Sequence, residues 1–287
     1  EGLFTSIISA ILTVEVTRLM INKKMVINLP DSVPNMVGDS FSSLLPLIVN
    51  VILATGIANL TINLAGKVFP EFIMSLLAPA ISSMDTLPAL LIVILLTQLL
   101  WFFGLHGPAI TSAVWAPFAI QYAAENIEAY TAGAEVTHFF TYGLYYNILQ
   151  VTGSGITLGL VILMMRSKAK SLSAIGKVGI VPSLFGINEP IIFGAPIILN
   201  PIMFIPFVFV PIINTIIAYF VLKAGLITPL VVLNSGAEPV ILNVLVLSAF
   251  KLGPVILYVL LFLLDMLLYA PFVKLQLKEN SKNNVTV

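Results

Sequence analysis

Glu189 is the residue whose setting most clearly predicts chemistry. It belongs to residues 186–194, Gly-Ile-Asn-Glu-Pro-Ile-Ile-Phe-Gly, between long apolar runs. An ionisable side chain in such surroundings is costly in a membrane and is a functional-site candidate by default. Pro190 cannot donate a backbone hydrogen bond and glycine permits sharp bends, so we expect Glu189 at a hairpin tip that faces a cavity. Its carboxylate could accept a hydrogen bond or a proton from a ligand hydroxyl. The alternative is a glutamate that caps a helix or forms a salt bridge.

His106 is the second candidate. It lies in residues 101–108, Trp-Phe-Phe-Gly-Leu-His-Gly-Pro, where one apolar run ends and another begins. An imidazole between glycines can approach a ligand closely, and near neutral pH it can bind a hydroxyl group or transfer a proton. We therefore predict that His106 contacts a ligand; the alternative is a histidine that only links two helices. Trp101 could cover an apolar face of the ligand or serve as an interfacial anchor.

Other polar residues are scattered through apolar stretches. Two are acids, Asp265 and Glu238, and four are amides, Asn200, Asn214, Asn234 and Asn243. Some are expected to line a ligand pathway and others to bond helix to helix. Residues 152–155, Thr-Gly-Ser-Gly, resemble a phosphate-binding turn, but they lack the lysine of a P-loop and the spacing of a dinucleotide site. We predict a flexible or closely packed loop there.

The composition predicts a protein of the lipid bilayer. Hydrophobic residues make up 59% of the 287 residues and charged residues only 9%, a balance typical of membrane proteins. Lys plus Arg and Asp plus Glu number 13 each, so no basic field exists to bind nucleic acid. The chain has no cysteine and two histidines. This excludes disulfides and a thiol nucleophile, and we predict no bound metal and no cofactor.

Six apolar segments are predicted to cross the membrane, because a helical span needs about 20 mostly apolar residues. They are Phe4–Met20, Ser43–Ala65, Leu87–Phe103, Gly155–Met165, Pro201–Leu222 and Pro254–Tyr269. The fourth is short unless its helix begins near Tyr146. The predicted fold class is an all-α integral membrane protein with several transmembrane helices, re-entrant hairpins and amphipathic helices.

Four further apolar segments are interrupted by proline and glycine. They are Phe69–Ile81, Pro108–Ala124, Phe185–Leu199 and Leu226–Leu247. Such segments suit hairpins that enter the membrane and turn back. Irregular backbone at membrane depth is tolerated only where protein or a water-filled cavity satisfies its polar groups, so these hairpins would mark a transport pathway. The alternative is a set of proline-kinked spanning helices.

Basic residues form three clusters, at positions 18–24, 166–177 and 274–282. By the positive-inside rule, these clusters are predicted to be cytoplasmic. Residues 123–136 carry three glutamates and no base, and we predict a loop there on the outer or cavity side.

One membrane domain is predicted for residues 1–277, followed by a polar cytoplasmic tail over residues 278–287. The first 20 residues lack the basic start and the small-residue cleavage site of a secretory signal. We therefore expect the sequence to begin inside a longer protein and the membrane domain to be incomplete at its N-terminus.

Five strings of residues follow the order and spacing of a known family. They are Leu29-Pro-Asp-Ser-Val-Pro34, then Ser40-Phe41 with Leu45-Pro46, residues 101–107, Gly153-Ser-Gly155 with Thr157-Leu-Gly159, and residues 182–201 around Asn188-Glu189-Pro190. With these strings most of the chain resembles the enzyme IIC component, the sugar permease, of the lactose/cellobiose/chitobiose family of bacterial phosphotransferase systems.

The resemblance implies a homodimer whose carboxyl-terminal half holds the sugar. It implies that Glu189 lies beside the hydroxyl group to be phosphorylated and that His106 helps to hold it, so these two are the predicted catalytic residues. The predicted sugar-binding residues are Asn188, Glu189, His106 and Trp101. The family's phosphoryl donor is a phosphocysteine on a IIB protein, and since this chain has no cysteine, the donor is expected on another polypeptide.

The chain departs from the family pattern in two respects. Typical members are longer and begin with additional spanning helices. They also carry a Trp-Thr-Thr-Pro-like string and a later tryptophan, where this chain has Leu226-Ile-Thr-Pro229 and no tryptophan after Trp115. If those aromatic rings stack on a sugar, their absence predicts a different sugar or a weaker site.

The predicted function is import of a sugar across the bacterial cytoplasmic membrane with phosphorylation by the IIB partner. The sugar is predicted to be a β-linked disaccharide such as cellobiose or diacetylchitobiose, and the chain would be the membrane subunit of a sugar phosphotransferase. One alternative is an ion-coupled secondary transporter in which Glu189 or Asp265 carries a proton. Another is a membrane remnant without transport activity.

Overall fold

The computed structural model describes residues 3–27, 29–30, 34–195, 197–232 and 238–283. Every regular element within these ranges is a helix, as predicted for an all-α membrane protein. The chain divides into two compact units, residues 1–81 and residues 82–287, whereas the sequence predicts one membrane domain over residues 1–277.

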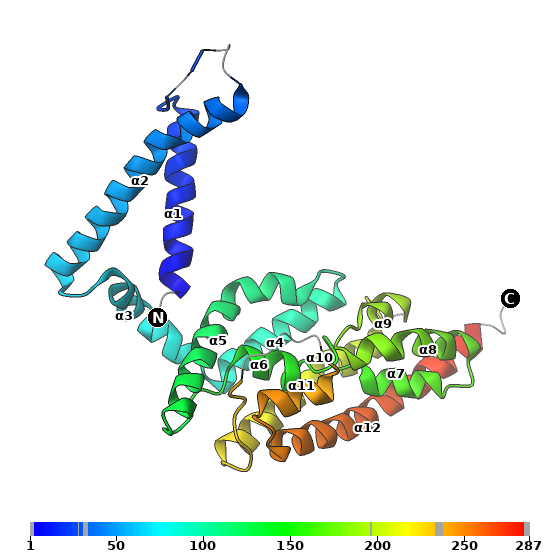
Figure 1. The fold of residues 1–287 in the computed structure, drawn as a ribbon. Coiled ribbons are helices and arrows are strands. Elements are labelled where there is room, and N and C mark those ends of the chain that lie inside the picture. Colours follow the sequence, from blue (N-terminus) through cyan, green and yellow to red (C-terminus); the bar gives the residue numbers. More distant parts are fainter. Residues whose placement is uncertain (1–2, 28, 31–33, 196, 233–237, 284–287) are drawn as a thin grey trace. The chain divides into compact units, whose positions relative to one another are not determined.

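The first unit contains α1 (Leu3–Asn22), α2 (Asn35–Ala65) and most of α3 (Phe69–Met84). Helices α1 and α2 pack against each other (Figure 1). Asn50 of α2 donates a hydrogen bond of 3.0 Å from Nδ2 to Oγ1 of Thr17 on α1. Most apolar side chains of these two helices are exposed, which is expected of helices that face lipid.

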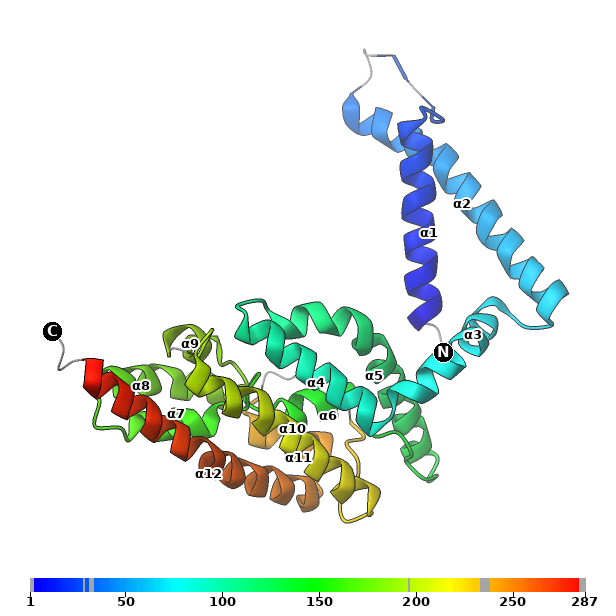
Figure 2. The same cartoon turned by 180° about the vertical axis from the view of Figure 1, so that it is seen from behind.

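The second unit contains the remaining helices. They are α4 (Leu87–Phe102), α5 (Gly107–Thr131), α6 (Tyr142–Leu144), the π-helix η1 (Tyr145–Leu149), α7 (Leu158–Met165), α8 (Lys170–Leu184), α9 (Glu189–Gly194), α10 (Pro201–Lys223), α11 (Val240–Leu247) and α12 (Leu252–Asn283). Helix α10 packs against α4 and α12, and α7 packs against α8 and α12 (Figure 2). The short elements α6, η1 and α11 contact one another or these longer helices.

The core of the second unit joins side chains from α4, α7, α8, α9, α10 and α12. Leu160, Ile191, Phe207 and Tyr269 belong to it. The Tyr269 hydroxyl on α12 donates a hydrogen bond of 2.5 Å to the carbonyl oxygen of Gly155. Helix α12 is therefore tied to the glycine-containing loop that precedes α7.

Four of the six predicted spans are confirmed as helices that are long and apolar enough to cross a membrane. They are Phe4–Asn22, Ser40–Ala65, Pro201–Lys223 and Leu252–Glu279. A fifth, Leu87–Phe102, is a shorter apolar helix of 16 residues. The prediction for Gly155–Met165 is wrong, because α7 has only 8 residues. Four residues before it, Thr152, Gly153, Gly155 and Ile156, have positive φ angles, which a right-handed helix does not permit.

Two of the four predicted hairpins are also wrong. Phe69–Ile81 lies within α3 and Pro108–Ala124 within α5, and both helices are continuous. Pro108 occupies the first turn of α5, where its missing N–H is not needed, and Pro117 is accommodated inside the same helix. The other two segments contain only the short helices α9 and α11 among their described residues.

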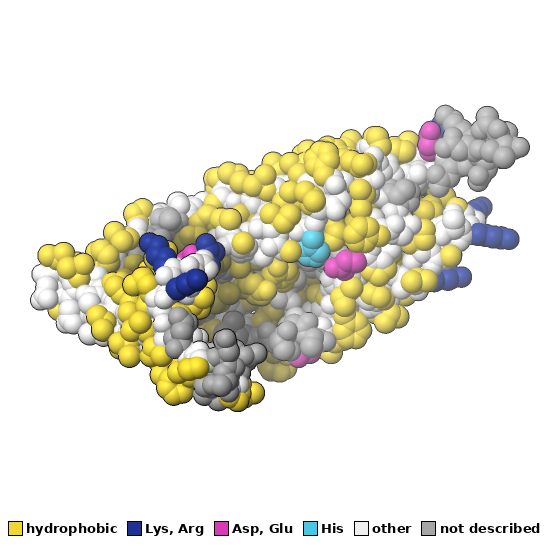
Figure 3. Space-filling view, turned by 90° about the horizontal axis from the view of Figure 1, so that it is seen from above, with side chains coloured by type: hydrophobic (Ala, Val, Ile, Leu, Met, Phe, Trp, Pro, Cys, Tyr) yellow, Lys and Arg dark blue, Asp and Glu magenta, His cyan; other side chains and the backbone are white. Residues whose placement is uncertain are grey.

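The predicted acidic loop at residues 123–136 is wrong in its first part, because α5 continues to Thr131. At the other end of the chain α12 continues to Asn283, beyond Lys278, where the polar tail was predicted to begin. Asn234 and residues 31–33 of the string 29–34 lie outside the described residues. On the face shown in Figure 3, hydrophobic side chains cover much of the surface and charged side chains are few, as expected for contact with lipid.

Candidate functional site

A cavity of about 430 Å³ lies in the second unit, within the size range of about 300–1,000 Å³ that is usual for ligand sites. Its lining comes from α4, α5, α6, η1, α9 and α11 and from the connections before α5, α6, α7, α9 and α11. All four residues predicted from the sequence line it: Trp101, His106, Asn188 and Glu189. The structure thus brings together two strings that are about eighty positions apart in the chain.

His106 is held by the start of α5. It is the N-cap residue of that helix, and its Nδ1 accepts a hydrogen bond of 3.1 Å from the backbone N–H of Ala109. A nitrogen that accepts a hydrogen bond carries no proton, so the proton of the neutral ring lies on Nε2. The capping contact therefore leaves Nε2–H as the donor that His106 can offer to a ligand.

Gly107 explains how the start of α5 comes close to α4. A Cβ atom at this position would lie 2.1 Å from the carbonyl oxygen of Thr97, a separation that no side chain tolerates. The two helices are also joined by the hydroxyl groups of Thr97 and Thr111, which are 2.8 Å apart. The glycine after His106 is thus required by close packing, and this packing fixes the direction of the imidazole.

Glu189 begins α9, and its side chain faces His106. The two atoms His106 Nε2 and Glu189 Oε1 are 3.8 Å apart, and 51% and 46% of the two side chains are exposed. This separation is too long for a hydrogen bond, so both groups keep polar capacity for a ligand. Gly186, with a φ of 79°, turns the chain between α8 and α9, a conformation that glycine adopts without strain.

Asn188 is buried, and its side chain forms hydrogen bonds that stabilise the local structure. Its amide Nδ2 donates hydrogen bonds of 2.6 Å to the carbonyl oxygen of Ser154 and of 3.1 Å to Oγ1 of Thr157. A Cβ atom on Gly153 would lie 2.3 Å from the Asn188 side chain. Asn188 therefore joins the Glu189 segment to the glycine loop, and the resemblance of that loop to a phosphate-binding turn reflects close packing.

Trp101 is only 3% exposed and packs directly on the imidazole. The ring centroids of Trp101 and His106 are 4.6 Å apart, and Trp101 also makes an edge contact with Phe193 of α9 at 5.9 Å. Within the described residues its indole Nε1 has no hydrogen-bond partner. The indole supports His106 and offers little free face for stacking on a ligand.

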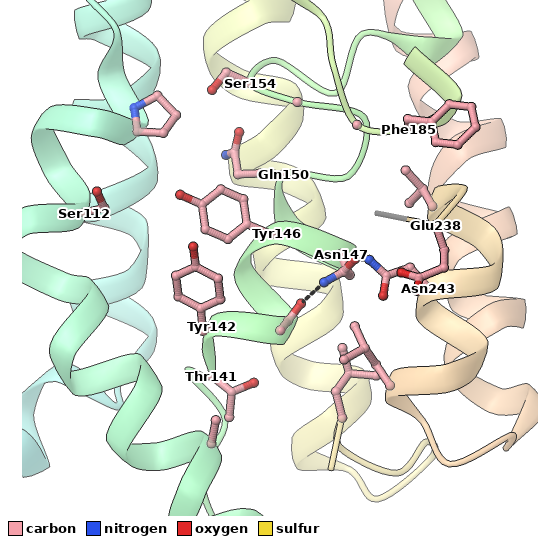
Figure 4. Close-up of a pocket in the computed structure, with 18 of the residues that line it drawn as sticks. Ser112, Thr141, Tyr142, Tyr146, Asn147, Gln150, Ser154, Phe185, Glu238 and Asn243 are labelled. Atoms are coloured by element: carbon pink, nitrogen blue, oxygen red, sulfur yellow. Dashed lines mark hydrogen bonds between the residues drawn. The ribbon is translucent and has the colours of Figure 1, made fainter. Parts of the chain in front are cut away.

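A row of polar and aromatic side chains on α6, on η1 and directly after η1 was missing from the residues predicted from the sequence. Tyr142, Tyr146 and Gln150 line the cavity, and the rings of the two tyrosines are 4.8 Å apart. Figure 4 shows both tyrosines pointing toward α5 and Ser112, whereas Asn147 points toward Asn243 of α11. The spacing of four residues between Tyr142, Tyr146 and Gln150 was the available signal, because it places them on one helical face.

The scattered acids and amides divide into two groups. Glu238 and Asn243 line the cavity, and Asn243 Nδ2 donates a hydrogen bond of 2.7 Å to Asn147 Oδ1. Asp265 and Asn214 do not line it; they are buried together, with Asn214 Nδ2 2.9 Å from Asp265 Oδ1, and join α10 to α12. The cavity lining therefore carries two carboxylates, and among the described residues no lysine or arginine. Such a lining favours a neutral ligand rich in hydroxyl groups over an anion.

Comparison with known proteins identifies the family. Residues 1–211 match the family model described as "Phosphotransferase system, EIIC". The chain is similar to the cellobiose-specific EIIC component of Geobacillus stearothermophilus, with 33% identity over 98% of this chain and 63% of the relative. It is also similar to the lactose-specific EIICB component of Lactococcus lactis subsp. lactis, with 32% identity over 100% of this chain and 51% of the relative.

A solved structure has the same fold. The transporter ChbC, the IIC component of the N,N'-diacetylchitobiose-specific phosphotransferase system, superposes with a TM-score of 0.93 and 31% identity, covering 99% of this chain and 66% of that chain. The oligo-beta-mannoside-specific EIIC component of Bacillus subtilis (strain 168) is 32% identical over 80% of this chain and 52% of its own length. The chain thus spans between about half and two thirds of the length of these proteins. It is a multi-pass membrane protein and belongs to the EIIC family of the phosphotransferase system.

Proposed function

We propose that this chain carries the sugar-binding part of a phosphotransferase-system permease, and that Glu189 and His106 hold the hydroxyl group that becomes phosphorylated. The observation that carries this proposal is the pair itself. His106 Nε2 and Glu189 Oε1 face each other at 3.8 Å, half exposed, in a cavity whose other polar groups are mainly hydroxyls and amides. A carboxylate acceptor and an imidazole donor side by side suit a hydroxyl group, which both donates and accepts hydrogen bonds.

In the proposed reaction, the sugar hydroxyl oxygen attacks the phosphorus atom of a phosphocysteine on a IIB partner. An O–P bond forms, the S–P bond breaks, and the partner's cysteine leaves as a thiolate with the bonding electrons. Glu189 accepts the proton that the hydroxyl group loses, a general-base role. His106 donates from Nε2 and keeps the sugar oriented, because positioning and charge stabilisation are the main protein contributions to phosphoryl transfer.

The phosphoryl donor lies outside these 287 residues, since they contain no cysteine. One of the relatives is an EIICB protein by name, which supports a IIB partner for this chain. A homodimer stays a prediction, and size-exclusion chromatography with light scattering on the detergent-solubilised protein would test it.

The proposed substrate is a β-linked disaccharide. The relatives are named for cellobiose, lactose and oligo-beta-mannosides, and ChbC for N,N'-diacetylchitobiose. Tyr142 and Tyr146 support a sugar ligand, because their neighbouring rings offer apolar faces and hydroxyl groups at the same cavity.

Uptake by cells that carry the permease together with its IIB partner tests the proposal. Radiolabelled cellobiose, diacetylchitobiose and lactose are supplied separately, and free sugar is then separated from phosphorylated sugar. One of them is expected to accumulate as the phosphate ester. Glu189→Gln should reduce that accumulation by about 100-fold or more, the usual contribution of a general base.

Glu128→Gln is the matched control, because Glu128 is an exposed glutamate on α5 that does not line the cavity. Its uptake should equal that of the unmodified permease. Accumulation of free sugar in cells that lack the IIB partner would overturn the proposal in favour of ion-coupled transport. Full phosphorylating uptake by Glu189→Gln would remove the proposed role of that residue.

A further inference from the structure

His138 lies between two carboxylates that come from different parts of the second unit. Its Nδ1 is 3.0 Å from Oδ2 of Asp85, between α3 and α4, and its Nε2 is 2.7 Å from Oε2 of Glu125 on α5. The side chains are mostly buried, with exposed fractions of 26% for His138, 14% for Asp85 and 37% for Glu125. None of the three residues lines the large cavity.

The backbone of residues 138–140 forms hydrogen bonds with the side chains of Asp85 and Asn126. Oδ1 of Asp85 accepts hydrogen bonds from the N–H groups of Phe139 at 3.0 Å and Phe140 at 2.6 Å. Asn126 of α5 donates to the carbonyl oxygen of His138 at 2.7 Å and accepts from its N–H at 3.0 Å. Residues 138–140 are therefore fixed to both α5 and the start of α4.

This segment leads directly into the cavity wall. Thr141 follows it, lines the large cavity and caps α6, where its Oγ1 accepts a hydrogen bond of 3.2 Å from the N–H of Leu144. Tyr142 and Tyr146 continue the same wall. Thr141 and Leu230 also line a second cavity of about 220 Å³ on the His138 side, so this wall separates two hollow regions.

The hydrogen bonds to both ring nitrogens require both protons. A neutral imidazole has one N–H, so it can donate to only one carboxylate, and its other nitrogen then presents a lone pair to the second. While both carboxyl groups are ionised, only the imidazolium form satisfies the two contacts together. The separations of 3.0 and 2.7 Å are those of hydrogen bonds between charged groups, so a proton is the species that fits between these atoms.

We propose that Asp85, His138 and Glu125 form a proton-dependent clasp that positions the Thr141–Tyr146 wall of the cavity. While His138 carries both protons, the clasp joins the segment to α5 and to the start of α4. When one proton leaves, one of the two side-chain bonds is lost and the wall loosens. His138 is thus a positioning residue that acts through the backbone of residues 139–141.

The groups around His138 make the protonated form favourable. The hydrogen bond to Asp85 is the main cause that raises the pKa of His138 above its usual value of 6.5, and the charge of Glu125 acts in the same direction, whereas burial opposes them. The Tyr122 ring stacks on the imidazole with centroids 4.7 Å apart. From α10, Tyr219 and Lys223 line the neighbouring small cavity, which Asp85 and His138 also line.

The direction of the pH effect follows from this raised pKa. The stability that the clasp contributes is fully present below about pH 6.5, the pKa of an unperturbed histidine. It is lost as the pH rises through the raised pKa of the folded protein. The wall is therefore expected to be tight in mildly acidic conditions and looser in alkaline conditions.

Hydrogen exchange of the backbone amides tests the clasp directly. The protection of the peptide that covers residues 137–141 is measured by mass spectrometry in detergent micelles between pH 6 and pH 9, after division by the intrinsic exchange rates. We expect protection in the unmodified chain to fall several-fold across this range. His138→Gln should be less protected at pH 6 and should lose the pH dependence.

Two further variants separate the clasp from a general loss of structure. Glu125→Gln removes one charged partner and should move the fall in protection to lower pH. Glu128→Gln, one turn along α5 and exposed, should behave as the unmodified chain. Protection that does not change with pH, or a His138→Gln variant that keeps the pH dependence, would overturn the proposal.

The consequence for ligand binding rests on the proposed function. Sugar affinity should fall several-fold as the pH rises in the unmodified chain, and His138→Gln should have weak affinity at every pH without a change in the identity of the preferred sugar. If no sugar binds at any pH while the exchange profile is as expected, the proposed function is wrong and the clasp stands. If sugar binds but the exchange profile is flat, the clasp is wrong and the proposed function stands.

Discussion

The two histidines of this chain meet carboxylates in opposite ways. His106 faces Glu189 across 3.8 Å, and about half of each side chain is exposed. His138 contacts Asp85 and Glu125 at 3.0 and 2.7 Å and is 26% exposed. Asp85 and Glu125 form hydrogen bonds within the protein, whereas Glu189 keeps its hydrogen-bonding capacity for a ligand. Residue type alone therefore does not distinguish a ligand-binding group from a structural one. The distinction depends on whether the group still has hydrogen-bonding capacity that the protein does not satisfy.

The largest loss of unfolding free energy is expected from Asp85→Ala, in the region around His138. This change removes the acceptor of two backbone N–H groups and of the His138 ring. Breaking a largely buried charged network of this kind costs about 2–4 kcal/mol of unfolding free energy. Equilibrium unfolding in mixed detergent micelles measures it. Glu71→Ala, at an exposed glutamate of α3, is the control, and equal stability of the two variants would show that the Asp85 contacts contribute nothing.

A smaller loss of unfolding free energy is expected from Asn126→Ala, which removes the two hydrogen bonds to the backbone of His138. Leaving a buried N–H and a carbonyl group without partners costs about 1–3 kcal/mol. The same unfolding measurement applies, with Asn59→Ala as the control, because the Asn59 amide donates a hydrogen bond to the carbonyl oxygen of Thr55 within its own helix. A variant with unchanged stability would mean that water replaces Asn126 without cost.

The half-exposed pair of Glu189 and His106 was predicted from the sequence, but the more buried cluster of Asp85, His138 and Glu125 was not. Glu189 and His106 stand out because each is an ionisable residue in an apolar run that contains glycine, and both prove to line one cavity. His138 gave no such signal. Its partners Asp85 and Glu125 lie 53 and 13 positions away, and Glu125 was assigned to a loop although it belongs to α5. Only the tertiary fold brings these three residues together.

The membrane class and the long spans could likewise be predicted, because the hydrophobic composition and segment length determine them. The continuity of α3 and α5 could not, since proline predicts a break or a kink equally well and the packing around it decides. The row of Tyr142, Tyr146 and Gln150 was missed because the helical stretch that carries it runs only from Tyr142 to Leu149, too short for a spacing of four residues to stand out as a periodic pattern.

Two variants of His106 should differ in stability, but both should have low sugar phosphorylation activity. His106→Ala loses the cap of α5, which costs about 1 kcal/mol, whereas asparagine is a good N-cap residue and His106→Asn should be nearly as stable as the unmodified chain. Both lack the Nε2–H donor, so both should lose most sugar phosphorylation. Unfolding and uptake measured on the same preparations check this, and equal stability of the two variants would mean that the bond from Ala109 does not stabilise α5.

The smallest effect on stability is expected from Glu189→Gln, and its comparison with Glu125→Gln is the sharpest test of the difference between the regions. Both changes replace a carboxylate by an amide of the same shape beside a histidine. Glu189 is half exposed and forms no hydrogen bond with His106, so its replacement should change the unfolding free energy by no more than about 0.5 kcal/mol. Glu125 accepts at 2.7 Å from His138, and below pH 6.5 its replacement should cost about 1–2 kcal/mol, as loss of a hydrogen bond to a charged group does.

Uptake should show the reverse order, with phosphorylation lost in Glu189→Gln and largely kept in Glu125→Gln. A Glu189→Gln variant as unstable as Glu125→Gln would place Glu189 among the structural carboxylates.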